Sequence, residues 1–188
     1  MNTVVIITVV SVLLVALVIF LIATYNNLVQ LRQRLRNAWS QVDVQLKRRY
    51  DLIPNLVNAI QGYAAHEKAT FEEIARVRAQ AMTATSVAEQ SQAENLLSGA
   101  LRSLFAVAEN YPELKANTNF LQLQEELSST ESKIAYSRQF YNDTVQKFNT
   151  RIELFPTNLV AGMLGFGPAD YFTLQGEPEA RQAVQVKF

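Results

Sequence analysis

His66 is the only histidine in the chain and cysteine is absent, which leaves few side chains able to bind a transition metal or attack a substrate. A di-iron helical bundle requires two Glu-x-x-His units, but the residue three positions before His66 is Tyr63. Glu67 follows His66, yet the second histidine of an H-E-x-x-H zinc motif is missing, as is a G-x-S-x-G nucleophile motif. Without cysteine, disulfides, thiolate catalysis and zinc-thiolate sites are excluded. We therefore expect no enzyme, no catalytic residue, no metal site and no cofactor, with His66 on a helix surface or partly buried.

Charged residues give no other sign of a catalytic centre or of nucleic-acid binding. The chain has 17 Lys and Arg residues against 17 Asp and Glu residues, so no general field attracts it to nucleic acid. Three carboxylates of one predicted helix, Glu125, Glu126 and Glu131, are expected in solvated ion pairs worth ~0–1 kcal/mol each. Their candidate partners are Lys47, Arg48, Arg49 and Arg76.

Two amides on the same predicted helix are better placed for a structural role. Asn142 and Asn149 lie seven residues apart, on one face and next to an apolar stripe. Buried amides in such positions can bond across helices and fix their register. We favour that role for Asn142 and Asn149 over contact with a ligand.

The elements that position these residues begin with an uncharged run at residues 4–23, and the first charged residue of the chain is Arg32. The length of this run matches the ~20 residues that a helix needs to cross a hydrocarbon layer ~30 Å thick. Thr8 and Ser11 are its only polar residues, and both hydroxyls can bond back to their own helix. We predict one transmembrane helix over residues 1–24. The positions assigned to it are Val4, Val10, Leu14, Phe20 and Ala23.

A cleaved signal peptide is the alternative to a retained anchor. Residues 1–3 carry no Lys or Arg, the apolar core exceeds the typical length of about 7–15 residues, and no A-x-A pattern surrounds Ala23. These features favour a retained anchor. Arg32, Arg34 and Arg36 follow the run, and the positive-inside rule places such a basic flank in the cytoplasm. We favour a cytoplasmic body, with an extracytoplasmic (periplasmic) body as the alternative.

Residues 25–155 show helical periodicity and predict an antiparallel four-helix up-down bundle, so the fold class is all-α. The first helix is expected to continue from the apolar run without interruption. The second is expected to begin at Asp51, with Pro54 in its first turn, and to end near Ala81. Two capping-box patterns, at Ser86 and at Ser91, are alternative starts for the third helix.

The fourth helix is the most regular, with apolar residues at steps of three and four from Phe120 to Phe155. Pro156 is expected to close it. A stripe of this length is also typical of a coiled coil between chains. The three other helices have matching apolar faces, and they favour a core within one chain.

Residues 156–188 are predicted to form an apolar segment followed by an extended tail. In an up-down bundle the fourth helix returns to the membrane, where this uncharged segment is expected to contact lipid, the base of the transmembrane helix or a neighbouring subunit. Folding back as a cap on the bundle core is the alternative. The residues assigned to a membrane or subunit contact are Phe155, Leu159, Val160, Met163, Leu164 and Phe166.

The end of the chain alternates apolar and polar residues over residues 183–188, the period of an edge strand. Such a strand could pair with Tyr171 and Phe172 in a small hairpin, or with a strand of another subunit. The second alternative, together with the apolar segment, indicates a homo-oligomer.

Four stretches of the chain resemble the signature of the LemA family, and the likeness extends over residues 25–188. They are residues 37–57 (NAWSQVDVQLKRRYDLIPNLV), 62–67 (GYAAHE), 137–143 (SRQFYND) and 155–166 (FPTNLVAGMLGF). The resemblance implies a bacterial single-pass protein of the plasma (inner) membrane with an external N-terminus and a helical-bundle domain. It brings no enzymatic activity and no catalytic residues. Family genes often neighbour those of membrane proteases, and a relative takes part in building magnetosome membranes.

Two functional classes follow from the residues and the resemblance together. The first is a membrane-anchored scaffold, self-assembling and involved in membrane organisation or envelope homeostasis. The second is an accessory or regulatory partner of a membrane protease. The partners expected are therefore the lipid bilayer, further copies of the chain and, in the second class, a membrane protease.

Overall fold

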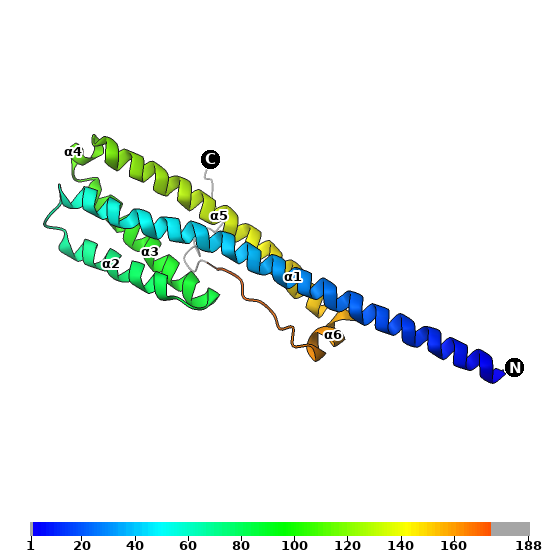
Figure 1. The fold of residues 1–188 in the computed structure, drawn as a ribbon. Helices are drawn as coiled ribbons and strands as arrows, with labels where there is room; N and C mark the ends of the chain where they lie inside the picture. Colours follow the sequence, from blue (N-terminus) through cyan, green and yellow to red (C-terminus); the bar gives the residue numbers. More distant parts are fainter. Residues whose placement is uncertain (1, 174–188) are drawn as a thin grey trace, which may run out of the picture. The chain divides into compact units, whose positions relative to one another are not determined.

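The computed structural model describes residues 2–173, and within this range every regular element is a helix. The all-α class and the long apolar helix at the N-terminus are confirmed, whereas the up-down order of a bundle stays a prediction. The predicted strand at residues 183–188 lies outside the described residues. The helices are α1 (Asn2–Gln61), α2 (Lys68–Thr83), α3 (Val87–Ala108), α4 (Pro112–Lys115), α5 (Thr118–Glu153) and α6 (Thr157–Met163) (Figure 1).

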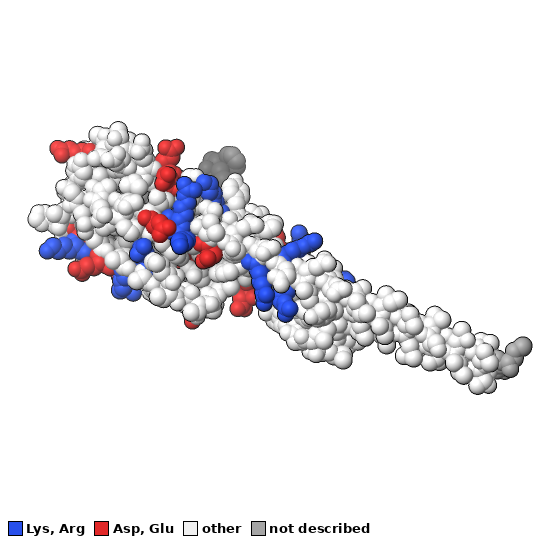
Figure 2. Space-filling model, viewed as in Figure 1, with Lys and Arg blue, Asp and Glu red and all other residues white. Residues whose placement is uncertain are grey.

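Helix α1 is a single helix of 60 residues whose first part is long and apolar enough to cross a membrane. The side chains of this part are exposed, and Figure 2 shows it as a rod without charged residues. Thr8 Oγ1 donates to the carbonyl of Val4 at 2.9 Å and Ser11 Oγ to that of Ile7 at 2.8 Å. Both hydroxyls are thus satisfied inside the helix, as a hydrocarbon environment requires.

The predicted start of a second helix at Asp51 is wrong, because α1 continues through Pro54 to Gln61. A proline inside a helix has no N–H for the carbonyl four residues earlier, which here belongs to Tyr50. Arg78 of α2 supplies the missing donor, with its Nε 2.8 Å from the Tyr50 carbonyl oxygen. The turn between the first two helices therefore falls later, between Gln61 and Lys68.

Local capping explains where two of the other helices begin. Ser86 caps α3 in a complete capping box with Glu89, which decides between the two predicted starts. Asn117 caps α5 by accepting from the backbone N–H groups of Asn119 and Phe120 at 2.9 and 3.2 Å. Between them α4, which the sequence patterns did not predict, begins at Pro112.

The chain forms two compact units, and α1 and α5 contribute to both. We call residues 2–39 and 140–169 the first unit, and residues 40–139 and 170–173 the second. The predicted domain boundaries at residues 24 and 155 follow the order of the chain, whereas these units do not.

The first unit has a small core beside the apolar part of α1. It consists of Leu28, Phe148, Ile152, Ala161 and Phe166. Trp39 and Tyr141 meet edge to face, with ring centroids 5.2 Å apart.

The second unit has the larger core, formed by α2, α3, α4 and the adjoining parts of α1 and α5. Its fully buried apolar side chains include Val42, Leu46, Ile53, Leu56, Ile60, Ile74, Val77, Leu97, Leu104 and Leu114.

Candidate functional site

A buried polar cluster lies inside the apolar core of the second unit. It consists of Arg49 and Tyr50 on α1 and Gln90 and Glu94 on α3, with Glu131 on α5 at its partly exposed edge. Arg49 is only 2% exposed, and its two terminal nitrogens donate to different carboxylates. Nη2 donates to Glu94, and Nη1 donates to Glu131 at 2.7 Å. One guanidinium thereby joins three helices.

Tyr50 and Gln90 complete the hydrogen bonding of the Glu94 carboxylate. The Tyr50 hydroxyl donates to Glu94 Oε1, and Gln90 Nε2 lies 3.0 Å from the same oxygen. Gln90 Nε2 is also 2.7 Å from the Tyr50 hydroxyl and 3.2 Å from the carbonyl of Ala81, at the end of α2. Every partner of Glu94 donates, which is the pattern that suits an ionised carboxylate.

Burial sets the titration of this cluster. It raises the pKa of the Glu94 carboxyl above its usual range, while Arg49, Tyr50 and Gln90 act in the opposite direction. Burial also raises the pKa of the Tyr50 phenol far above its ordinary value, and the neighbouring charge of Glu94 adds to that. Tyr50 consequently stays a hydrogen-bond donor at every physiological pH.

The contacts of the polar cluster hold three helices together. Both oxygens of Glu94 and both terminal nitrogens of Arg49 are already engaged. The adjoining cavity, of about 100 Å³, is lined by both residues and is bordered by Phe172, which is itself buried. Such a volume holds only a few water molecules at ~30 Å³ each.

A pattern in the sequence could have revealed the polar cluster. Val42, Leu46 and Ile53 define the buried stripe of α1, and Arg49 occupies a stripe position between them. Glu94 does the same on α3, three residues before Leu97. A charged residue in the apolar stripe of each of two helices is the signature of a buried ion pair.

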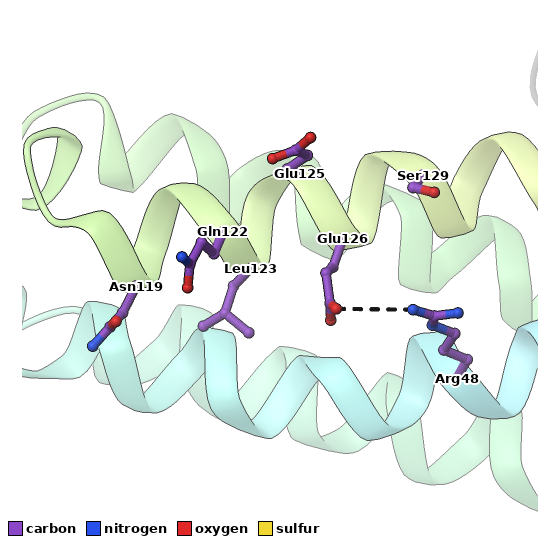
Figure 3. A pocket seen from close by; sticks show the side chains of 7 residues that line it. All are labelled: Arg48, Asn119, Gln122, Leu123, Glu125, Glu126 and Ser129. Atoms are coloured by element: carbon purple, nitrogen blue, oxygen red, sulfur yellow. Dashed lines mark ion pairs between the residues drawn. The ribbon is translucent and has the colours of Figure 1, made fainter.

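A wider, open pocket of about 660 Å³ lies on the surface of the second unit, between α1 and α5 (Figure 3). Arg48 and Glu126 face each other in it, 3.8 Å apart and about half exposed. Glu125 also borders it, but points away from Arg48 in Figure 3. The pair between Arg48 and Glu126 is the solvated ion pair expected for this carboxylate.

Of the other predicted ion-pair partners, Arg49 binds Glu131, whereas Arg76 pairs with Glu73 on its own helix. His66 is exposed in the turn between α1 and α2. No group of three or more His, Cys, Asp or Glu side chains within residues 2–173 could hold a metal ion.

The first unit carries an exposed apolar surface, formed by α6 and the residues at its ends. We call it the α6 patch: Phe155, Leu159, Met163 and Leu164, which are 80%, 60%, 85% and 50% exposed. All four were predicted to contact a membrane or a subunit.

The remaining two residues of that predicted set are turned inward. Val160 is 5% and Phe166 is 8% exposed, so neither can contact lipid or another subunit in this structure. Phe166 packs in the core with Leu28, while Tyr25 meets its ring edge-on at 6.2 Å. The guanidinium of Arg32 lies over the same ring, 4.9 Å from its centre. Phe166 therefore contacts the base of α1, which is one of the predicted alternatives.

A glycine turn places Phe166 in the core. Gly165 has a φ of +70°, and the N–H of Phe166 reaches back to the carbonyl of Ala161 at 3.0 Å. This is the Schellman ending of a helix, in which glycine takes the left-handed position and the next residue packs on the last turn. Ala161 and Phe166 accordingly share the core of the first unit.

Asn149 was predicted to bond across helices, and the structure gives it another partner. Its Nδ2 donates to the carbonyl of Ala169 at 2.9 Å, and its Oδ1 accepts from the N–H of Ala169 at 2.8 Å. Asn149 therefore fastens the segment after α6 to α5 instead of setting helix register. Asn142 is half-buried on α5 in the same unit, and its register role stays a prediction.

These features define a membrane-associated helical protein, with an apolar N-terminal helix and a polar cluster that serves packing. The chain belongs to the LemA family, whose model matches residues 38–188. The resemblance found in the sequence is thereby confirmed.

Named relatives support the same class. The chain is 31% identical to Protein LemA of Metamycoplasma hominis over 74% of its own length, and it spans 64% of that protein. It is 28% identical to Magnetosome protein MamQ 2 of Paramagnetospirillum magneticum, covering 87% of this chain and 70% of the relative. Magnetosome protein MamQ of Magnetospirillum gryphiswaldense is 26% identical, with coverage of 85% and 68%. None of these names denotes an enzyme.

Proposed function

We propose that the chain is a non-enzymatic scaffold, anchored in a bilayer by the apolar part of α1 and assembling with further copies to organise the membrane. The observation that carries this proposal is the continuity of α1. One helix of 60 residues begins in the apolar run and supplies core residues to both compact units, Leu28 to the first and Leu46 to the second. A folded body joined to its anchor without a linker suits a structural role.

The buried polar cluster supports the same reading. An ion pair such as Arg49–Glu94 adds little net stability against well-packed apolar residues, but it discriminates against other packings. A scaffold depends on one defined arrangement of its helices. The relatives named as magnetosome proteins are associated by their names with a membrane-bounded structure, which fits a role in membrane organisation.

The orientation of the body is part of the proposal. Arg32, Arg34 and Arg36 follow the apolar run, and a basic flank is retained in the cytoplasm. Alkaline phosphatase fused after Phe188 should therefore be inactive in cells. An active fusion would place the body outside the cytoplasm.

Electron microscopy of the full-length protein in lipid vesicles tests the scaffold directly. We expect ordered or clustered assemblies on the membrane, and native mass spectrometry of the detergent-solubilised protein should show oligomers. The matched control is Arg49→Met, which breaks the polar cluster and should reduce the order of the assemblies without removing the anchor. Dispersed monomers of the unmodified protein in both measurements would refute self-assembly.

A further inference from the structure

We propose that the α6 patch inserts into the boundary between headgroups and acyl chains of the leaflet at which the apolar part of α1 ends, so that the chain meets one bilayer at two places. This inference rests on the proposed anchoring by α1. It deepens the scaffold by naming the surface through which the folded body contacts lipid.

The course of α5 in the first unit brings the α6 patch to the level of the membrane surface. Trp39 on α1 contacts Tyr141 on α5, whereas Leu28 shares a core with Ile152. Moving back along α1 toward the apolar run thus means moving forward along α5, so the two helices are antiparallel here. Phe155, two residues after the end of α5, continues in the direction of the apolar run.

The distances along α1 fit the thickness of the interface. Leu28 is five residues after Ala23, which is ~7.5 Å at the 1.5 Å rise of a helix. The interfacial region on each side of the hydrocarbon core is ~5–8 Å thick. The core containing Leu28 and Phe166 therefore lies at the outer limit of this region, and groups nearer to Ala23 lie within it.

The chemistry of the segment also matches a lipid interface. No residue from 154 to 169 is charged, so insertion would bury no ion. The guanidinium of Arg32 lies over the ring of Phe166, near the end of this uncharged segment. Arg34 and Arg36 are exposed further along α1. Basic side chains at this height can reach lipid phosphates while the apolar side chains remain below them.

The packing of α6 within the first unit does not explain why its outer face is apolar. Thr157, Val160 and Ala161 bury the inner face, yet the outer face consists of large apolar side chains instead of polar ones. Contiguous apolar surface of this kind marks a membrane or protein contact. Its position beside the membrane-crossing part of α1 selects the bilayer. Because the α6 patch enters only one leaflet, it would act as a wedge beside the transmembrane helix and favour curvature.

Single-cysteine labelling tests this proposal cleanly, because the chain has no cysteine of its own. Full-length Met163→Cys carries an environment-sensitive fluorophore in vesicles of phosphatidylethanolamine and phosphatidylglycerol. Phe140→Cys is the matched control. Phe140 is an exposed apolar residue of the same unit that precedes Ile152 on α5 by ~18 Å, so it lies further from the apolar run. Val18→Cys, within the apolar run, reports on the anchor itself.

We expect the label at position 163 to emit at shorter wavelength in vesicles and to be quenched by lipids with a nitroxide near the headgroup end of the acyl chain. The label at position 140 should show neither change, and the label at position 18 should be quenched by nitroxides deeper in the chain. Adding Leu159→Asp to Met163→Cys should reduce the shift without releasing the protein from the vesicles.

Three other outcomes would overturn the proposal, and they are distinguishable. Quenching at position 18 but not at 163, without a spectral shift at 163, refutes the wedge and leaves the anchor intact. A shift at position 163 without quenching by lipid nitroxides shows that a second protein surface, such as another copy of the chain, covers the α6 patch. Absence of quenching at both positions refutes the anchor, and the wedge with it.

Discussion

Replacing Arg78 with methionine tests why α1 continues through Pro54. The structure attributes this continuity to the hydrogen bond from Arg78 Nε to the Tyr50 carbonyl, which the proline leaves without its helical donor. A hydrogen bond from a charged donor contributes ~1.5–3 kcal/mol, and an unsatisfied buried carbonyl costs ~1–3 kcal/mol. Arg78 is only partly buried, so we expect Arg78→Met to lower the free energy of unfolding by about 2 kcal/mol.

A double-mutant cycle isolates the carbonyl. In a Pro54→Ala background the N–H of Ala at position 54 bonds to the Tyr50 carbonyl, so Arg78 is no longer needed there. The same Arg78→Met substitution should then cost less than about 1 kcal/mol, a coupling of ~1–2 kcal/mol between positions 54 and 78. Denaturant unfolding of the full chain in detergent, followed by circular dichroism, measures all four proteins.

The control for this cycle is Arg76→Met on the same helix. Arg76 pairs with Glu73 at the surface and makes no contact with α1 among the interactions described above, so its replacement should leave stability unchanged. If Arg78→Met costs the same with proline or alanine at position 54, the explanation for the unbroken helix is wrong.

Three further predictions concern the buried polar cluster and the segment after α6. Arg49→Met should lower the free energy of unfolding by about 3–5 kcal/mol in denaturant titrations, because it leaves Glu94 buried without its cation; a loss under about 1 kcal/mol would contradict this. Burial raises the folded-state pKa of Glu94 above its ordinary value, so the folded protein holds this proton more tightly than the unfolded chain does, and stability is lost as pH rises from the ordinary glutamate pKa through the raised one. Glu94→Gln should remove that part of the slope, and equal slopes for the two proteins would refute the assignment. Asn149→Ala should speed hydrogen exchange at the Ala169 amide, since two hydrogen bonds worth ~0.5–1.5 kcal/mol each are lost; unchanged exchange there would count against the contact.

The features that depend on neighbouring residues were predictable from the sequence. The apolar run, the helical class and the Ser86 capping box follow from composition, period and a motif of four residues. The apolar segment that carries the four exposed residues of the α6 patch, including Met163, is visible in the sequence as the absence of charge after α5.

The features that depend on residues distant in the sequence were not predictable from it. Pro54 ends a helix by the usual local rule, and only the hydrogen bond from Arg78, which lies in the next helix, reverses that outcome. The inward position of Phe166 requires the left-handed conformation of Gly165 and packing against Leu28 of α1. The partner of Asn149 lies beyond α6, so the heptad spacing that indicated a register role carried no information about it.

The most direct test of the account is the immersion depth of a spin label at Met163, measured by electron paramagnetic resonance in vesicles against a ladder of labels along α1. The ladder uses Val18, Tyr25 and Arg34, which run from the apolar part of α1 to its basic flank. Since the α6 patch shares a compact unit with Tyr25 and Leu28, we predict a depth at Met163 close to that at Tyr25. A depth at Met163 equal to that at Arg34, with the label in water, would contradict the account.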